Sequence, residues 1–220
     1  MRRSRCVTVS TVIGMILMAG CSGAGTFETN QQTSAGKKVE QFLSAEDAEV
    51  STIIAEYAEE TEYPELAQFL ISYYQIPEEY RGETRYYYNY VDLNEDGQRE
   101  IFAVVIGEYT EVPFGDPAVI LTEEEGSFAV IEDFAGVRTP IRISEMTTNG
   151  WHDIMYQEYG GDKEDGYRIC RYSPDGGYQT SLSEVVGKME PVGGTNILSN
   201  NLIDDMDQGR YLTLVPQEKK

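Results

Sequence analysis

The segment from Asp92 to Glu100, DLNEDGQRE, carries the clearest chemical pattern in the sequence. Oxygen-bearing side chains stand at its first, third, fifth, seventh and ninth places, and Ca²⁺ takes roughly six to eight oxygen ligands, backbone carbonyls included. Gly97 at the sixth place permits the sharp bend that aims such groups at one point. The candidate ligands of a calcium ion are therefore Asp92, Asn94, Asp96, Gln98 and Glu100.

The same segment also suits a hairpin turn that needs no metal, because Asn, Asp and Gly are the residues such turns prefer. An EF-hand is excluded, because Ala103 stands where that loop would close with a bidentate glutamate. Both interpretations stay open from the residues alone. In either case the segment fastens a turn and does not perform catalysis.

A weaker copy of this pattern follows at a constant offset of 53 residues. Tyr90-Val91-Asp92 corresponds to Ile143-Ser144-Glu145, and Gly97 corresponds to Gly150. Thr147 stands at the third place of the copy, so we expect no metal there. The offset predicts a duplicated antiparallel β-meander with repeats at 85–134 and 138–182.

Two helices are expected before these strands, as a hairpin over residues 44–76. Apolar side chains follow the helical spacing from Val50 to Tyr57 after a capping box at Ser44, and again from Leu66 to Tyr73 after Pro64. The predicted fold class is α+β, a helical hairpin packed on a compact sheet or sandwich. The expected single domain spans 39–220 and ends in a C-terminal segment, 183–220.

From Arg85 onward, short runs of Tyr, Val and Ile alternate with Gly, Asp, Asn and Pro, which is typical of antiparallel strands joined by turns. The predicted strands are 86–91, 100–107, 117–122, 127–134, 139–144, 151–159, 167–172, 177–181 and one near 210–215.

The amino terminus has the layout of an export signal. Arginines precede an apolar run from Val7 to Ala19, about 13 residues and too short to cross a bilayer as a helix. The sequence that ends at Cys21, LMAGC, resembles the lipobox of bacterial lipoproteins, which implies that residues 1–20 are removed and that Cys21 carries the lipid. The alternative is a secreted protein cut at Ala19-Gly20. Residues 21–38, rich in Gly, Ser and Thr, are expected to form a flexible tether.

Charge limits the partners. Without residues 1–20 the chain keeps 14 basic and 38 acidic side chains, a net charge of −24. Such a surface repels phosphate backbones and anionic headgroups, so we expect no nucleic acid and attachment to a plasma membrane or outer membrane only through the lipid anchor. Cations and basic partners are favoured, although the same charge also serves solubility.

Nucleophile chemistry has few candidates. Cys170 is the one thiol left after Cys6 and Cys21 are used, so no internal disulfide is expected, and its strand-like surroundings predict a buried, inert side chain. His152 is the only histidine. One histidine excludes a His-rich zinc site and leaves little room for a Ser-His-Asp triad.

Aromatic residues suggest a contact surface. Tyr86, Tyr88 and Tyr90 alternate along one strand and share a sheet face, and Trp151 follows the second turn. These rings could stack on sugars or contact a protein. Tyrosine and tryptophan are also ordinary fillers of strands and cores.

Taken together, the lipobox, the Tyr-rich strand that enters Asp92–Glu100 and the segment from Thr148 to Ile154 resemble a group of uncharacterised bacterial envelope lipoproteins with FG-GAP-like, integrin-type calcium-loop repeats. The resemblance brings no assigned reaction. We expect a non-enzymatic binding or accessory module that recognises an envelope protein or a cell-wall glycan. The alternatives are a glycan hydrolase with paired carboxylates and an inhibitor of an extracellular enzyme, with the loop Glu108–Pro117 as its contact.

Overall fold

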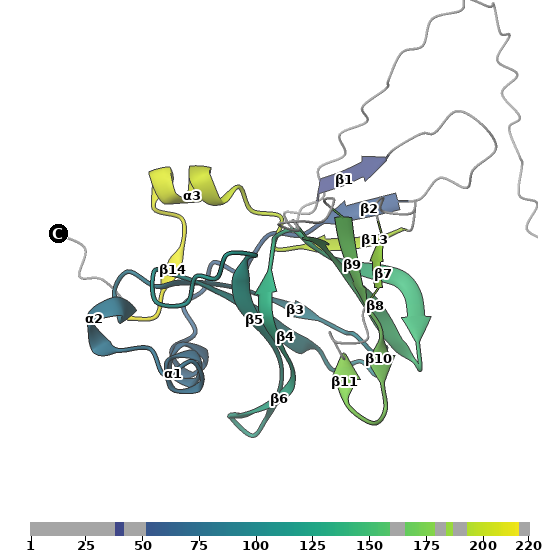
Figure 1. Cartoon of the computed structure of the whole chain (residues 1–220), viewed down its shortest axis with the longest axis horizontal. Coiled ribbons are helices and arrows are strands. Elements are labelled where there is room, and N and C mark those ends of the chain that lie inside the picture. The colour runs from purple at the N-terminus through teal and green to yellow at the C-terminus, as the bar shows by residue number, and fades with distance from the viewer. Residues whose placement is uncertain (1–37, 42–51, 159–165, 179–183, 187–192, 216–220) are drawn as a thin grey trace, which may run out of the picture.

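Two β-sheets pack face to face, and a helix covers the outer face of one of them (Figure 1). The computed structural model describes residues 38–41, 52–158, 166–178, 184–186 and 193–215. The predicted signal peptide, residues 1–20, lies outside the described residues, as does the predicted tether up to residue 37. Among the described helices, none combines the length and the apolar character that a membrane span requires.

The first sheet has five strands in the order β14-β3-β4-β5-β6, all antiparallel. Strand β4 is buried along almost its whole length, because both faces of this sheet are covered. The strands are β3 (Arg85–Val91), β4 (Glu100–Ile106), β5 (Asp116–Glu124), β6 (Ser127–Val137) and β14 (Leu212–Thr213).

The second sheet has seven strands in the order β1-β2-β13-β7-β8-β9-β12. Strand β13 runs parallel to β2, and the other pairs in this sheet are antiparallel. The strands are β1 (Lys38–Gln41), β2 (Thr52–Ala55), β7 (Ile141–Thr148), β8 (Trp151–Glu158), β9 (Gly166–Cys170), β12 (Glu184–Val186) and β13 (Gly194–Ile197). A small hairpin, β10 (Tyr172–Ser173) with β11 (Gly177–Tyr178), packs against β6.

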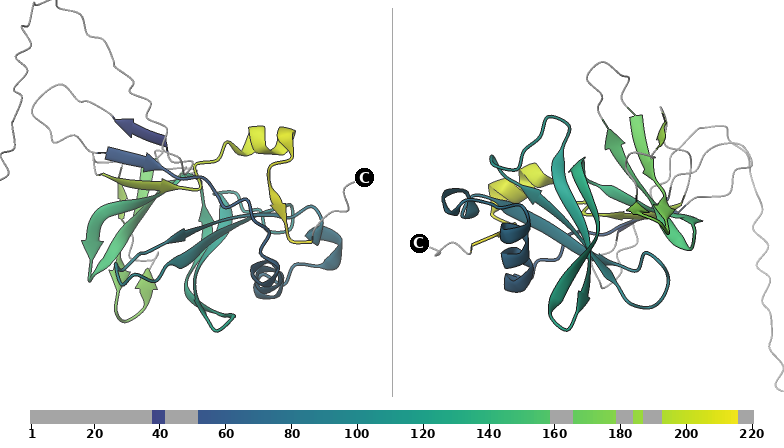
Figure 2. Two further views of the ribbon diagram at one scale, coloured as in Figure 1. Left: turned by 180° about the vertical axis from the view of Figure 1, so that it is seen from behind. Right: turned by 60° about the horizontal axis from the view of Figure 1, so that its bottom comes forward.

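Apolar side chains form two layers. The inner layer lies between the sheets and contains Phe102 and Phe134 from the first sheet with Ile154 from the second. The outer layer lies between the first sheet and helix α1 (Pro64–Tyr73), whose Leu66 and Leu70 are fully buried. Burial of each of these leucines contributes about 1.5–3 kcal/mol. Figure 2 shows the same order of layers from two other directions.

Two further helices lie near β14. Helix α2 (Glu78–Arg81) follows α1, and helix α3 (Leu202–Gln208) precedes β14. The Asn201 side chain caps α3 by accepting hydrogen bonds from the backbone N–H groups of Ile203 and Asp204. Gly209 ends α3 in the left-handed conformation, with φ of 65°. This ending turns the chain back towards β3.

The predicted helical hairpin is confirmed in its second half only. Pro64 begins α1 as predicted, and the helix ends at Tyr73, before the predicted end at residue 76. The first predicted helix is wrong where it can be seen: Thr52–Ala55 is strand β2, paired with β1 and β13, while 44–51 lies outside the described residues. Thr52, Ile53 and Ile54 are β-branched, and this strand preference wins once two partner strands are available.

The predicted strands after Arg85 are confirmed in position as far as the described residues reach, while residue 159 and residues 179–181 of the predicted strands lie outside them. Consecutive strands pair as a meander in each sheet. The two segments that correspond by the offset of 53 residues both join antiparallel strands, β3 to β4 and β7 to β8. The first is an eight-residue loop, 92–99, called the acidic loop below, while the second is a tight turn at Asn149-Gly150. These two connections therefore differ in form.

Candidate functional site

The acidic loop is held by its own side chains. The Gly97 N–H donates to Asp92 Oδ2 over 3.0 Å, the Gln98 N–H to Asp96 Oδ1 over 2.7 Å, and the Asp96 N–H to Asn94 Oδ1 over 3.1 Å. Gly97 has φ of 85°, which only glycine adopts freely. The predicted ligand side chains Asp92, Asn94 and Asp96 therefore also satisfy the backbone of a well-formed turn.

Both ends of the loop are tied into the protein. Leu93 is fully buried in the layer between the sheets. Its N–H donates to Glu100 Oε2 over 2.8 Å, and Glu100 is itself buried at the start of β4. Burial raises the pKa of the Glu100 carboxyl above its ordinary value, the backbone hydrogen bonds lower it, and the neighbouring charges of Asp96 and Asp92 raise it further. The carboxyl thus holds its proton to a higher pH than an exposed glutamate.

The loop also joins the two sheets. The backbone N–H of His152 in β8 donates to the carbonyl oxygen of Leu93 over 2.8 Å. The His152 ring lies between the Ser144 carbonyl oxygen, 2.7 Å from Nδ1, and the Glu95 carboxylate, 3.4 Å from Nε2. Tyr178 donates its hydroxyl hydrogen to the His152 carbonyl oxygen over 2.7 Å. His152 is therefore a structural junction in this fold.

One carboxylate oxygen of the acidic loop, Asp92 Oδ1, is in a position where a bound cation would be favourable. Asp92 Oδ1 is buried and has no hydrogen-bond partner among the described residues. A metal ion would satisfy it, and all candidate ligands are the hard oxygen donors that calcium prefers. Within the described residues, however, no three His, Cys, Asp or Glu side chains are grouped closely enough to hold a metal ion. The chemistry of the ligand atoms fits calcium. In this structure, however, the carboxylates of Asp92 and Asp96 accept hydrogen bonds from backbone N–H groups of the loop and do not converge on one point.

The predicted contact surface is wrong for two of its residues. Tyr86 and Tyr88 are 2 % and 3 % exposed, because this face of β3 lies under α1. Tyr90 is half-buried, and the Arg99 guanidinium lies 4.9 Å from the centre of its ring. Trp151 is half-buried and stacks on Tyr172 with 4.4 Å between ring centres. These rings pack mainly within the protein.

The loop Glu108–Pro117 is anchored at the buried Thr110 and Gly115, while its aromatic residues Tyr109 and Phe114 are exposed. Val112 and Gly115 exchange backbone hydrogen bonds of 3.3 and 3.2 Å, which closes the loop into a tight turn. The Tyr109 ring lies 5.4 Å from the Tyr80 ring. The prediction for Cys170 is confirmed in that its side chain is fully buried.

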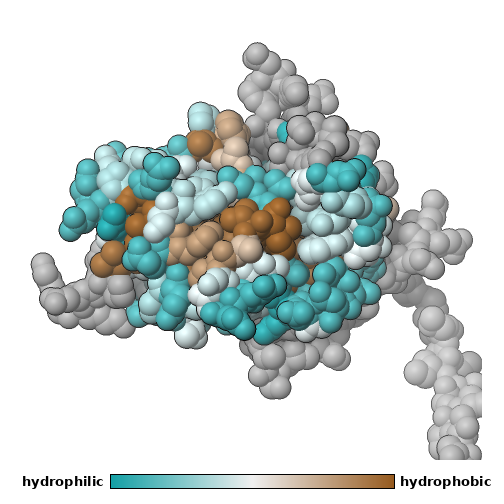
Figure 3. All heavy atoms as spheres, turned by 90° about the horizontal axis from the view of Figure 1, so that it is seen from below, coloured by the Kyte–Doolittle hydropathy of each residue, from teal (hydrophilic) through white to brown (hydrophobic). Residues whose placement is uncertain are grey.

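Aromatic side chains fasten α1 to the β5–β6 hairpin. The Phe128 ring lies 5.4 Å from Phe69 and 5.8 Å from Tyr63. On the face seen from below in Figure 3, apolar residues form a band across the middle, and hydrophilic residues border it. The aromatic contacts anchor the helix that covers the first sheet.

A pocket of about 320 Å³ opens beside β3. Two segments cover the edge of β3, and the pocket lies between them. The segment before α1 contacts β3 through the Glu59 N–H, which donates to the Tyr88 carbonyl oxygen over 2.8 Å. Strand β14 contacts it through Leu212, which pairs with Tyr86. We call this site the β3 pocket. It is lined by Ala58, Glu59, Glu60, Glu62, Tyr86, Tyr87, Asn200, Asp205, Gly209, Arg210, Tyr211 and Leu212.

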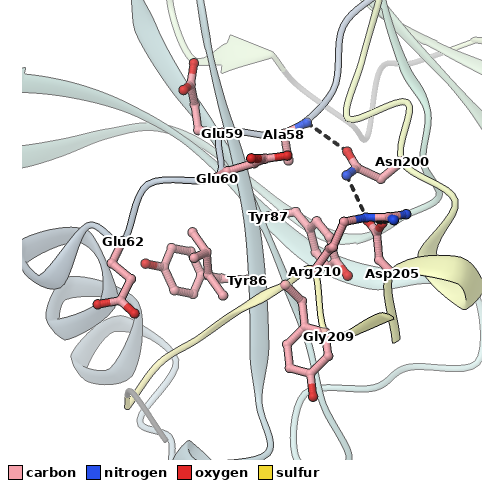
Figure 4. Close-up of a pocket in the computed structure, with 12 residues that line it drawn as sticks. Ala58, Glu59, Glu60, Glu62, Tyr86, Tyr87, Asn200, Asp205, Gly209 and Arg210 are labelled. Carbon is pink, nitrogen blue, oxygen red and sulfur yellow. Dashed lines mark hydrogen bonds and ion pairs between the residues drawn. The ribbon is translucent and has the colours of Figure 1, made fainter. Parts of the chain in front are cut away.

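Opposite sides of the β3 pocket carry different groups (Figure 4). Glu59, Glu60 and Glu62 come from the segment before α1, and all three are exposed. On the other side Arg210 donates to Asp205 Oδ1 from Nε, over 3.1 Å, and from a terminal nitrogen, over 2.9 Å.

The segment 56–63 is rigidly placed although it has no regular structure. The Glu56 N–H donates to the Asn196 carbonyl oxygen, and the Ala58 N–H donates to Asn200 Oδ1, each over 2.8 Å. Further along, Tyr88 donates its hydroxyl hydrogen to the Thr61 carbonyl oxygen over 2.9 Å, and the Tyr63 N–H donates to the Tyr86 hydroxyl oxygen over 3.1 Å. These bonds fix the backbone from which the three glutamates project.

Little in the sequence indicates this pocket, because its two sides are about 150 positions apart. The one local signal is the acidic run before Pro64, EETE, which charge alone does not distinguish from a solvated surface. A comparison with known proteins finds no family model, no curated protein and no solved structure that matches this chain.

Proposed function

We propose that this protein is a membrane-anchored, extracytoplasmic lipoprotein that acts as a non-enzymatic binding or accessory module through the β3 pocket. The observation that carries the proposal is the pocket itself: about 320 Å³, with a rim of exposed carboxylates on a backbone fixed by hydrogen bonds. Concave sites with a few convergent polar groups are where proteins bind small groups, and a rigid rim loses little freedom on binding.

The anchor in this proposal is a lipid on Cys21, with residues 22–38 as the tether. The net charge of −24 without residues 1–20 keeps the domain away from anionic headgroups. The two hairpin units, as in FG-GAP-like repeats, form the scaffold. Calcium bound by the acidic loop has a structural role, because the loop links β3 to β8 through Leu93 and His152.

Photocrosslinking in intact cells tests the binding role. The photoreactive residue p-benzoylphenylalanine replaces Tyr211, which is aromatic, exposed and on the pocket rim. The control position is the exposed Met146 on β7. The proposal expects discrete adducts from position 211 that the Glu60→Gln and Glu62→Gln double substitution removes, and none of these adducts from position 146. The same adducts from both positions, or none from position 211, would overturn it.

Fractionation of the same cells tests the anchor. The unmodified chain is expected in the membrane fraction and the Cys21→Ser chain in the soluble extracytoplasmic fraction, because lipid attachment supplies the membrane affinity. Equal distribution of the two chains would refute lipid anchoring at Cys21.

A further inference from the structure

We infer that the β3 pocket binds an organic cation, an alkylammonium or guanidinium group. The inference rests on the proposed function, since it names the ligand class of the same pocket. Its basis is the combination of rim charge, a tyrosine hydroxyl in the pocket lining that has no protein partner, and a size that suits one side-chain-sized group.

The charges of the lining residues favour a cation. Four acids, Glu59, Glu60, Glu62 and Asp205, face a single base, Arg210. Arg210 is paired with Asp205 through both of its hydrogen bonds to Oδ1, and the Asn200 amide donates to Asp205 Oδ2 over 2.9 Å. The three rim glutamates are therefore left as the uncompensated charge of the pocket.

The arrangement suits an organic cation better than a metal ion. A divalent metal needs several oxygen ligands within about 2.6 Å of one point. No three acidic side chains among the described residues are grouped in that way. Three carboxylates from one side of the pocket that do not converge on a single point instead suit a cation that has volume and several N–H donors. Tyr211, the exposed tyrosine of the lining, supplies aromatic surface for the carbon atoms of such a group.

The Tyr87 hydroxyl supplies a second, independent indication. Its side chain is 3 % exposed, lines the pocket beside Arg210 (Figure 4), and forms no hydrogen bond to any described residue. Burial, together with the charge of Asp205, raises the pKa of Tyr87 to about 12, so the phenol stays protonated at neutral pH. The Tyr87 oxygen is not among the enclosed side-chain atoms that lack a partner, so it is open to the pocket and can accept an N–H of the bound cation.

The volume of the β3 pocket further limits which organic cations it can bind. Ligand pockets range from about 300 to 1,000 Å³, and the β3 pocket lies at the lower end of that range. It accepts a lysine or arginine side chain or a short diamine, and is too small to enclose a chain of several sugars. The cation thus comes either from a free amine or from a basic side chain of a partner protein, and the two sources share the same recognition chemistry.

A titration followed by ligand-detected nuclear magnetic resonance tests the inference on the full chain in non-ionic detergent. The probes are cadaverine and Nα-acetyl-lysine methylamide, each with a neutral counterpart of equal length, 1,5-pentanediol and Nα-acetyl-norleucine methylamide. We expect a dissociation constant of about 1 mM or below for at least one cation and no saturable binding of the neutral counterparts. Tighter binding of cadaverine indicates a free amine, and tighter binding of the lysine derivative indicates a partner side chain.

Matched substitutions localise the effect. The pair Glu60→Gln and Glu62→Gln should weaken cation binding about tenfold, and Tyr87→Phe should weaken it several-fold. The control pair, Glu78→Gln and Glu79→Gln, changes the net charge equally on exposed residues of α2 outside this pocket, and should leave the affinity within about twofold. An unchanged unfolding temperature shows that the variants are folded.

Two results would overturn the inference: equal binding of cations and neutral counterparts, or equal weakening by the two pairs of substitutions. Failure of the ligand class is distinct from failure of the proposed function. Crosslinks from position 211 without cation binding would retain the pocket as a docking site and reject its ligand class, whereas cation binding without crosslinks would retain the ligand class and reject docking of an envelope partner at the pocket.

Discussion

The backbone N–H of His152 donates a 2.8 Å hydrogen bond to the carbonyl oxygen of Leu93, and this bond connects the two sheets at one end of the sandwich. Leu93 belongs to the acidic loop after β3, and His152 belongs to β8. The Leu93 side chain is fully buried beside the bond. The junction thus combines an apolar anchor with a polar bond, and the two parts contribute differently to stability.

The apolar anchor should dominate. Leu93→Ala is expected to lower the free energy of unfolding by about 2–5 kcal/mol, because it leaves a cavity between the sheets. Glu95→Gln removes the exposed partner of His152 and should cost about 0–1 kcal/mol. Chemical denaturation followed by circular dichroism measures both. Equal losses would show that the contact between Glu95 and His152 contributes as much to the junction as Leu93 does.

Two tyrosines with buried side chains should respond oppositely to loss of the hydroxyl. Tyr178→Phe removes the 2.7 Å bond to the His152 carbonyl oxygen and should cost about 0.5–1.5 kcal/mol. Tyr87→Phe removes a hydroxyl that has no partner among the described residues and should leave stability unchanged or slightly higher. Thermal unfolding of both variants provides the comparison, and a larger loss from Tyr87→Phe contradicts the assignment of its free hydroxyl.

The buried Glu100 carboxyl should make stability depend on pH. Its pKa is raised in the folded protein, so the folded state binds this proton more tightly than the unfolded state. The resulting stabilisation is complete below the unfolded pKa, about 4.5, and is lost as pH rises through the higher folded pKa. The free energy of unfolding of Glu100→Gln minus that of the original chain should therefore increase with pH across this window. Chemical denaturation at several pH values measures this difference, and EDTA in each sample removes any contribution from a bound metal ion. A constant difference would reject the raised pKa.

Calcium should stabilise the protein if the acidic loop binds it. At a calcium concentration 100 times the dissociation constant the gain is about 2.7 kcal/mol, which at this size raises the unfolding temperature by roughly 5–10 °C relative to EDTA. Asp96→Asn should remove the rise, while Glu145→Gln in the weaker copy should keep it. Absence of a rise in the original chain would leave the acidic loop as a hairpin connection that needs no metal.

Much of the strand layout could be predicted, because alternation and turn residues are local signals. Asn149-Gly150 marks its turn directly, with φ of 53° and 82°. Pro64 marks the start of α1 for a similarly local reason. Strand β2 could not be predicted in this way, since its parallel partner, Gly194–Ile197, is about 140 residues distant and no local pattern announces that pairing.

The candidate site likewise has parts that local sequence patterns indicate and a part that they do not. The acidic loop was visible because its groups lie within nine consecutive residues. The tyrosine face was located correctly on β3, but the sequence does not show that α1 covers it. The β3 pocket stayed hidden because Glu60 and Arg210 meet only after β14 has paired with β3. Local patterns specify the elements, whereas the pocket is a product of their assembly.

The stacking of Trp151 on Tyr172 gives the protein an internal optical reporter. The protein has a single tryptophan, and it adjoins His152, whose N–H is bonded to the acidic loop. Its emission therefore comes from one known place, at the contact between the sheets. Fluorescence of the unlabelled protein can follow, in real time and without a dye, how cation binding or calcium binding is transmitted to that contact.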